Sequence, residues 1–344
     1  MPPRPRRIAL IAPVWYPIAP DRGGIEQMVF LLARELVERG HEVTLVASGD
    51  SRTAGRLVAV CEEGVVSAME KGRADDYAPY EAAAIAAALR IAPEVDVVHS
   101  HLSGSMVPFT PLLPVPVLHT MHCPVAQDIS WLAGRFPDVR MTVVSRHLAD
   151  SLRATAKVAV VPNGIELEGF SPSFEAGDFL LYLGRVEEGK GVRVAMDVAA
   201  AAGFPLVIAG DCTDRAFFTE HIANADPNGV RYVGRVGGAR KAELLRRARA
   251  LLFPVLKEES FGLVLLEAMA SGTPVVALRK GAVAEVVTPG VNGFYADEPA
   301  ELPALVARVG EIDRRRVAAS IEARYSHHRM VDAYVDLYRQ MTAS

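Results

Sequence analysis

The stretch of sequence that decides the fold class reads FPVLKEESFGLVLLEAMASGTP over residues 253–274. It begins with the end of a short apolar strand and continues into an apolar helical segment that stops at a Gly-Thr-Pro turn. We expect Ser260 to cap a helix over residues 261–271, with Gly272 as the left-handed residue after its last turn. A buried strand followed closely by an apolar helix indicates a sheet that helices cover on both faces.

The same alternation of apolar runs and amphipathic segments extends along the chain. Residues 24–39, for example, have apolar side chains at helical spacing and lie between the strand-like residues 8–13 and 42–47. Repeated strand–helix units with continuously apolar strands predict the α/β class, with two doubly wound Rossmann-like domains. The expected strands are residues 8–13, 42–47, 95–99, 116–120, 141–145, 179–183, 205–209, 231–233, 250–254 and 274–277.

A polar segment rich in Gly, Pro and Ser separates two halves of similar length. It spans residues 166–178, and the strand pattern restarts after it. We therefore expect an N-terminal domain over residues 1–165, a C-terminal domain over residues 166–325, and an amphipathic helix within residues 326–344. Ligands of such sheets bind beyond the carboxyl ends of the strands, so with two facing sheets the expected site is the cleft between the domains.

Composition and charge exclude several classes of protein. The 344 residues are 50% hydrophobic and 23% charged, as in a folded globular protein. A formal net charge of −4 argues against a nucleic-acid partner, because nucleic-acid-binding domains are strongly basic. Three widely spaced cysteines form no disulfide framework and favour a reducing, cytoplasmic location. No run of about 18 apolar residues is present, so we expect no transmembrane segment.

Two cations mark the start of the second half, which reads LGRVEEGKG over residues 183–191. Arg185 follows the first strand of this half and Lys190 precedes its first helix, so both are expected at the carboxyl edge of the sheet. Two fixed cations stabilise the negative charge that develops on a departing nucleoside diphosphate. Since the sequence also lacks an Asp-x-Asp pair, we predict no metal and no cofactor.

A glycine pair, Gly23-Gly24, follows the first strand and opens a helix. It is not the GxGxxG fingerprint of a dinucleotide-binding turn, which argues against an NAD enzyme. Two glycines allow a ligand to approach the backbone closely, and the free N–H groups of a helix start suit an anion. The alternative is a flexible loop before an ordinary helix.

Two carboxylates belong to the stretch that was quoted first. Glu259 precedes the expected helix, and Glu267 lies eight residues later, about 12 Å along a helix axis that rises ~1.5 Å per residue. That span matches the distance from a transferred sugar across a diphosphate to a ribose. Glu259 would hold sugar hydroxyls, the N–H groups of Gly262 and Leu263 would hold phosphate, and Glu267 would accept both ribose hydroxyls. A carboxylate among the apolar neighbours of Glu267 needs such partners.

Taken together, these motifs resemble the retaining glycosyltransferases of family 4, which have the GT-B fold. The resemblance rests on Glu259-x7-Glu267, Arg185-x4-Lys190, the Gly23-Gly24 loop and the VPNG turn at residues 161–164, and it covers nearly the whole chain. It implies that the glycine loop contacts the diphosphate, that the two cations neutralise it, and that the final helix packs back onto the N-terminal domain. The residues it implies for nucleotide-sugar binding are Gly23, Gly24, Arg185, Lys190, Arg235, Val236, Glu259, Ser260, Phe261, Gly262, Leu263 and Glu267.

The resemblance also assigns a histidine. His122 belongs to a Thr-x-His motif after an apolar strand, which places it beside the donor sugar, so His122, Arg185, Lys190 and Glu259 are the expected catalytic residues. Cys123 stands where the family often has glycine, which would crowd the sugar pocket. The nearby histidines at positions 99, 101 and 119 lack the ligand set of a metal site, and we interpret them as strand-end residues.

The expected reaction moves a glycosyl group from a nucleoside-diphosphate sugar, with UDP favoured, to an acceptor bound by the N-terminal domain. Residues 51–79 balance basic against acidic side chains and so form no patch for an anionic membrane, which favours a soluble small-molecule or oligosaccharide acceptor. The compact, Ala/Arg/Val-rich chain is similar to actinomycete enzymes that decorate antibiotics, such as those of the avilamycin-type oligosaccharide pathway.

Two alternatives are open at this point. A nucleotide-sugar 2-epimerase shares the architecture but would need acid–base groups on the sugar and would lack both paired motifs. A non-catalytic nucleotide-sugar binder would keep the motifs but would not hydrolyse the donor slowly in the absence of acceptor.

Overall fold

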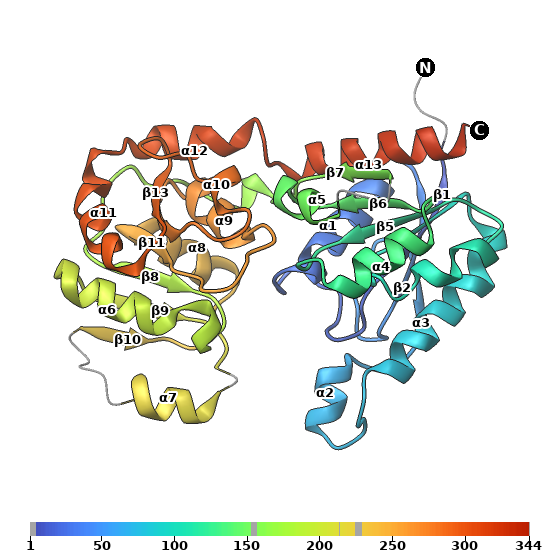
Figure 1. Ribbon diagram of the computed structural model, residues 1–344, viewed down its shortest axis with the longest axis horizontal. Helices are drawn as coiled ribbons and strands as arrows, with labels where there is room; N and C mark the ends of the chain where they lie inside the picture. The colour runs from blue at the N-terminus through green and yellow to red at the C-terminus, as the bar shows by residue number, and fades with distance from the viewer. Residues whose placement is uncertain (1–4, 153–156, 213, 224–228, 344) are drawn as a thin grey trace. The chain divides into compact units, whose positions relative to one another are not determined.

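The computed structural model describes residues 5–152, 157–212, 214–223 and 229–343. The chain divides into two units (Figure 1). Unit 1 comprises Met1–Gly164 and His327–Ser344, and unit 2 comprises Ile165–Ser326. Each boundary lies one residue from the division expected from the sequence.

Unit 1 is built on a parallel sheet whose described strands follow the order β3-β2-β1-β4-β5-β6-β7. The central strand β1 is apolar and buried from Ile8 to Ile11, and it pairs with β2 on one side and β4 on the other. The strand order reverses between β1 and β4, which is where doubly wound sheets bind ligands. The strands are β1 (Arg7–Ile11), β2 (Glu42–Ala47), β3 (Arg56–Ala59), β4 (Val97–Ser100), β5 (Val117–Met121), β6 (Arg140–Val143) and β7 (Lys157–Val160).

The C-terminal helix belongs to unit 1, although the whole of unit 2 precedes it in the chain. Figure 1 shows this helix, α13 (His327–Thr342), in red along unit 1, where it contacts α1 and β4. Its apolar stripe buries Tyr334 and Tyr338 completely. The other α-helices of this unit are α1 (Ile25–Glu38), α2 (Val65–Glu70), α3 (Ala78–Ile91), α4 (Gln127–Arg135) and α5 (Arg146–Ser151).

Unit 2 repeats the plan with a parallel sheet in the order β10-β9-β8-β11-β12-β13, which reverses between β8 and β11. Its strands are β8 (Leu180–Leu183), β9 (Leu206–Ala209), β10 (Val230–Tyr232), β11 (Ala250–Phe253), β12 (Val275–Leu278) and β13 (Gly293–Ala296). Its α-helices are α6 (Val192–Ala202), α7 (Arg215–His221), α8 (Gly238–Arg247), α9 (Leu263–Ala270), α10 (Val283–Val286), α11 (Leu302–Arg308) and α12 (Arg314–Glu322).

The sequence predicted ten of these strands, with boundaries that differ by no more than a few residues, but it missed β3, β7 and β13. Strand β3 lies at the edge of its sheet and is half-exposed, so it lacks a continuous apolar run. Strand β13 begins at Gly293, where a Cβ atom would lie 2.3 Å from the carbonyl oxygen of Val275. The close pairing of the strands therefore requires glycine, and in a sequence glycine usually indicates a turn.

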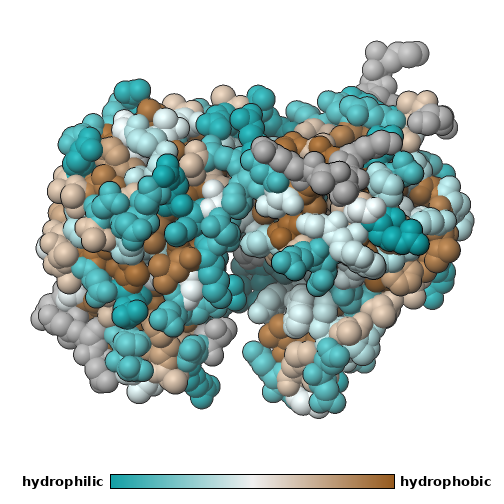
Figure 2. Space-filling model, viewed as in Figure 1, coloured by the Kyte–Doolittle hydropathy of each residue, from teal (hydrophilic) through white to brown (hydrophobic). Residues whose placement is uncertain are grey.

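Polar side chains predominate on the face of the molecule shown in Figure 2, with apolar residues between them. Among the described residues, no helix combines the length and the apolarity needed to cross a membrane.

A buried arginine joins several segments of unit 2. The Arg314 guanidinium, at the start of α12, donates to the carbonyl oxygens of Ser173, Arg246 and Ala248 at 2.8, 3.0 and 3.0 Å and to Thr273 Oγ1 at 2.7 Å. Two of these carbonyls lie at the C-terminal end of α8, where the helix dipole favours a cation. Burial lowers the pKa of Arg314 to about 10, so the group remains charged at neutral pH.

We predict that Arg314→Met will lower the free energy of unfolding by about 3 kcal/mol, because it leaves several buried carbonyls without a donor. Urea denaturation measures the change. The matched control is Arg316→Met on the exposed side of the same helix, for which we expect a change within ~0.5 kcal/mol. Equal stabilities of the two variants would contradict this role for Arg314.

Candidate active site

The loop after β8 contains Arg185 and Lys190, the two cations that the sequence predicts for the site. Arg185 and the short 3-10 turn Glu188–Lys190 both follow the carboxyl end of this strand. The Tyr182 hydroxyl lies 2.7 Å from the carbonyl oxygen of Arg185 and 3.3 Å from that of Lys190, which holds the two ends of the loop together. Burial raises the pKa of Tyr182 well above its usual range, so the phenol keeps its proton.

Lys190 and Glu259 form an ion pair at the edge where β8 and β11 end. Lys190 Nζ lies 3.0 Å from Glu259 Oε2, and the two side chains are 30% and 16% exposed. Glycine lets the backbones on either side come together: a Cβ at Gly191 would lie 1.9 Å from the carbonyl oxygen of Pro254, and one at Gly281 would lie 2.1 Å from that of Glu259. The sequence predicted both charged residues but not their direct pairing.

Arg185 is placed differently from Lys190. Its guanidinium is 60% exposed and lies 3.2 Å from Glu187 Oε2. The structure therefore places Arg185 on the same loop as Lys190 but not in the Lys190–Glu259 pair.

The predicted start of the helix after Glu259 is wrong. Helix α9 begins at Leu263, and its N-terminal flanking residue is Gly262, not Ser260. Gly262 has a φ of 83°, so its left-handed backbone separates residues 259–261 from the helix. The estimate of about 12 Å along one axis between Glu259 and Glu267 therefore does not apply, because Glu259 lies outside the helix. The predicted end is confirmed, since Gly272 follows the helix with a φ of 76°.

Glu267 lies inside the molecule with a protein partner that the sequence did not suggest. The carboxylate is 6% exposed, and its Oε1 lies 2.6 Å from Nζ of Lys241 on α8. We expected a ligand at Glu267 because a buried carboxylate needs a polar partner. Lys241 already supplies one such partner. The contact joins the consecutive helices α8 and α9 across 26 positions of the sequence, so no short-range pattern predicts it.

Ser260 and Phe261 have little side-chain surface for a ligand. Both are buried, and the Phe261 ring packs edge-to-face on Tyr325 with 5.8 Å between ring centroids. In this structure Phe261 is a core residue, so any contact that it makes with a nucleotide would come from its backbone.

Arg235 and Val236 lie in the loop after β10. Arg235 Nε lies 3.7 Å from Asp211 Oδ2, and both side chains are about half-exposed. The loop is attached to the neighbouring β9 end by the Gly210 N–H, which donates to the carbonyl oxygen of Gly234 at 3.0 Å.

In unit 1, the glycine pair lies at the N-terminus of α1. Gly23 and Gly24 are exposed, and Gly24 flanks the helix with a φ of 69°. Their neighbour Glu26 lies in the first helical turn, with its Oε2 3.8 Å from where a Gly24 Cβ would be. Burial raises the pKa of Glu26 to about 7.

His122 follows β5 and is 8% exposed. Its Nε2 lies 2.9 Å from Nδ1 of His101, which follows the neighbouring strand β4. Burial lowers the pKa of His122 to about 4, so the ring is neutral at pH 7. The sequence proposed no partner for His122, although the His-x-His and Thr-x-His patterns at the ends of two strands were a usable signal.

A second group of histidines lies elsewhere in unit 1. Glu35, His327 and His328 place three potential metal-ligand atoms within 4.8 Å of one another. Among the described residues, this is the group of His, Cys, Asp or Glu side chains close enough to hold a metal ion. The Arg39 guanidinium donates to Glu35 at 2.8 Å, so the carboxylate already has a cationic partner. This cluster connects the start of α13 to α1.

The sequence analysis missed an aromatic pair formed by Trp15 of the β1–α1 loop and Tyr77, which immediately precedes α3. Trp15 stacks on Tyr77 with 3.9 Å between ring centroids and 3° between ring planes, yet Trp15 remains 40% exposed. The loop is fixed by backbone bonds from the N–H groups of Val65 and Val66 to the carbonyl oxygens of Val14 and Trp15.

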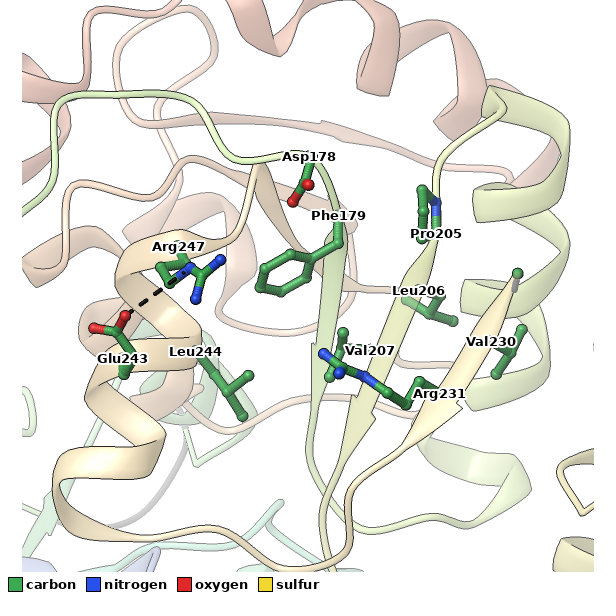
Figure 3. A pocket seen from close by; sticks show the side chains of 11 residues that line it. Asp178, Phe179, Pro205, Leu206, Val207, Val230, Arg231, Glu243, Leu244 and Arg247 are labelled. Atoms are coloured by element: carbon green, nitrogen blue, oxygen red, sulfur yellow. Dashed lines mark ion pairs between the residues drawn. The ribbon is translucent and has the colours of Figure 1, made fainter. Parts of the chain in front are cut away.

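Unit 2 also contains a cavity of about 500 Å³ (Figure 3). It is lined by residues that lead into β8, β9 and β10, including Phe179, Pro205 and Gly229, and by Arg247 of α8. It therefore lies at the amino ends of the strands, opposite the edge that carries Lys190 and Glu259, and we do not assign the donor to it.

Comparisons with known proteins agree with these two units. The sequence model described as Glycosyltransferase Family 4 matches residues 22–168, and the model described as Glycosyl transferases group 1 matches residues 165–324. The chain is a glycosyltransferase of the family 4 type, with the GT-B fold. The predicted fold class and the prediction of a glycosyltransferase are thereby confirmed.

Three similar proteins illustrate the range of this glycosyltransferase type. The D-inositol 3-phosphate glycosyltransferase of Acidothermus cellulolyticus is 29% identical, over 98% of this chain and 91% of its own. The phosphatidyl-myo-inositol mannosyltransferase of Mycobacterium leprae is 26% identical, over 98% of each chain. The crystal structure of AviGT4, a glycosyltransferase involved in avilamycin A biosynthesis, matches with a TM-score of 0.72 and 28% identity over 99% of both chains.

We predict that Glu26→Gln will stabilise the protein at pH 8. The raised pKa means that folded Glu26 holds its proton up to a pH of about 7, whereas the unfolded carboxyl loses it near 4.5, so stability falls as the pH rises between these values. Removing the charge should add about 1–3 kcal/mol at pH 8 and little below pH 4.

Urea denaturation at both pH values measures the effect. Glu38→Gln near the exposed end of the same helix is the control, with no gain expected. A Glu26→Gln variant with the same stability gain at both pH values would show that the charge of Glu26 is not its cause.

Proposed function

We propose that this glycosyltransferase transfers a sugar from a nucleoside-diphosphate sugar, with UDP favoured, to a soluble acceptor with retention of the anomeric configuration. The observation that carries the proposal is the Lys190–Glu259 pair at the carboxyl edge of β8 and β11 in a chain of the family 4 type. The pair offers a cation for a diphosphate next to a carboxylate for sugar hydroxyls.

In this proposal, unit 2 holds the donor. Lys190 and Arg185 contact the diphosphate, and the Gly262 and Leu263 N–H groups at the start of α9 support a phosphate. Glu259 uses Oε1 for a sugar hydroxyl, since Lys190 contacts its Oε2. Glu267 contributes to ribose binding while Lys241 holds its Oε1. The loop with Arg235 and Val236 receives the base.

Unit 1 contributes the Gly23-Gly24 loop to the diphosphate and His122 to the donor sugar. The C1–O bond to the β-phosphate breaks, and the acceptor oxygen forms its bond to C1 on the same face. The acceptor proton passes to the departing phosphate oxygen, which becomes more basic as the bond breaks. Lys190 and Arg185 stabilise the charge on the leaving diphosphate, so the scheme requires no metal.

For the acceptor, we propose a soluble cyclic polyol or sugar, as in secondary-metabolite biosynthesis. Stacking of Trp15 on Tyr77 leaves an exposed, rigid indole in the β1–α1 loop, and an indole of this kind packs against the apolar face of a ring. Two of the named relatives are named for inositol derivatives, and AviGT4 is involved in avilamycin A biosynthesis. The inositol names are compatible with a ring-shaped acceptor.

The test is a transfer assay with α-linked UDP-, GDP- and TDP-sugars in EDTA, with myo-inositol, D-inositol 3-phosphate and free hexoses as acceptors. We expect one donor to react and NMR to show an α-linked product. A β-linked product would overturn retention. Absence of both transfer and slow hydrolysis with every donor would support a non-catalytic binder instead.

We predict that Lys190→Ala will slow transfer by about 10²–10³, the loss typical when one group that stabilises a developing anion is removed. Initial rates at saturating donor measure the change. Arg247→Ala, which removes a cation at the opposite edge of the same unit, should retain full activity. Equal activity of the two variants would show that Lys190 does not stabilise the leaving group.

We also predict that Trp15→Ala will raise the KM for the acceptor by about five- to tenfold, because a stacking contact of about 1 kcal/mol is lost. Donor hydrolysis without acceptor should stay unchanged. Trp131→Ala, which removes an indole that is 67% exposed on α4, is the control and should leave both measurements unchanged. A Trp15→Ala variant with an unaltered acceptor KM would exclude Trp15 from the acceptor site.

A further inference from the structure

The ends of β4 and β5 bring four polar side chains together inside unit 1. The strands are parallel and pair His99 with Leu118, so alternate residues beyond this point, His101 and Thr120, lie on the same face of the sheet. His122 follows two residues after Thr120. All four side chains are at least nine-tenths buried.

These side chains form two separate hydrogen-bonded groups. His99 uses both ring nitrogens, with Nδ1 2.6 Å from the Tyr338 hydroxyl and Nε2 2.6 Å from Thr120 Oγ1. His101 uses only one, with Nδ1 2.9 Å from His122 Nε2. His101 Nε2 is buried and has no partner among the described residues. The His99 ring lies beside that of His101, with 4.1 Å between ring centroids, which limits rotation of His101.

The hydrogen bond between His101 Nδ1 and His122 Nε2 can carry its proton on either nitrogen. The unpartnered His101 Nε2 distinguishes these two arrangements. If His122 donated from Nε2, the proton of His101 would reside on its own Nε2 and form a buried N–H without an acceptor. If His101 donates from Nδ1, its Nε2 is instead a bare nitrogen. Buried N–H groups without acceptors are the rarer feature of folded proteins.

We propose that His101 is a positioning residue that donates from Nδ1 to His122 Nε2 and thereby fixes His122 in the tautomer with its proton on Nδ1. His122 then presents an N–H donor on the side of its ring away from His101. Burial lowers the pKa of both rings, so the arrangement persists at neutral pH.

The tautomer defines what His122 contributes, and this step rests on the proposed function. An Nδ1–H donates to a sugar hydroxyl oxygen or to a phosphate oxygen, whose negative charge grows as the C1–O bond breaks. It does not accept a proton from the acceptor hydroxyl. The assignment therefore agrees with a reaction in which that proton goes to the leaving phosphate, and His122 acts as a neutral hydrogen-bond donor.

NMR of ¹⁵N-histidine-labelled protein without substrate tests the proposal directly, because long-range ¹H–¹⁵N spectra show which ring nitrogen carries the proton. A His122→Gln variant identifies the His122 signals by their loss. We expect the His122 proton on Nδ1 in the native protein. A proton on Nε2 would overturn the proposal, whatever the transfer assay gives, so the result is independent of the proposed function.

Two substitutions extend the test to activity. His101→Asp places an acceptor opposite His122 Nε2 and should move the proton to that nitrogen, with kcat reduced by about 100-fold and a smaller change in the donor KM. His101→Asn has an N–H in the position of Nδ1 and should keep both the tautomer and most of the activity. Unchanged kcat in a folded His101→Asp variant with a moved proton would refute the donor role. If that variant does not fold, the native spectrum and His101→Asn decide.

Discussion

The proposed donor site of this glycosyltransferase depends on how closely three backbone segments meet at the carboxyl edge of the sheet in unit 2. The turn after β8 meets the loop after β11 at Gly191, and that loop meets the segment after β12 at Gly281. A side chain at either glycine would collide with a carbonyl oxygen at 1.9 or 2.1 Å, and both glycines have positive φ angles. Because these segments are held together, Lys190 and Glu259 come within 3.0 Å although 69 positions separate them in the sequence.

The two units supply different kinds of polar group. Unit 2 contributes charged residues, namely the Lys190–Glu259 and Lys241–Glu267 pairs and the exposed Arg185. The buried polar residues of unit 1 near the ends of β4 and β5 are neutral, because burial lowers the pKa of every histidine there. This division suits the proposed reaction, in which cations stabilise the leaving diphosphate and neutral donors orient the sugar.

Much of the fold could be predicted because continuously apolar strands and capped helices leave strong local signals. The prediction failed where a glycine has a conformational role, as at Gly262, whose left-handed backbone delays the start of α9, and at Gly293, where strand pairing excludes a side chain. Arg185, Lys190 and Glu259 were predictable from their positions after strands, and Glu267 from its apolar neighbours. Partners such as Lys241 and Tyr338 were not, because they lie on other helices, 26 positions from Glu267 and 239 positions from His99, and only tertiary packing brings them together.

The central claim is that Lys190 and Glu259 form a donor site that binds a nucleoside diphosphate without a metal. Calorimetric titration with UDP, GDP, TDP and ADP in EDTA tests it most directly, using the native chain and Lys190→Met. The account predicts that one diphosphate, UDP being favoured, binds the native protein and binds the variant at least tenfold more weakly. Binding that requires an added divalent metal, or equal binding by both proteins, would contradict it.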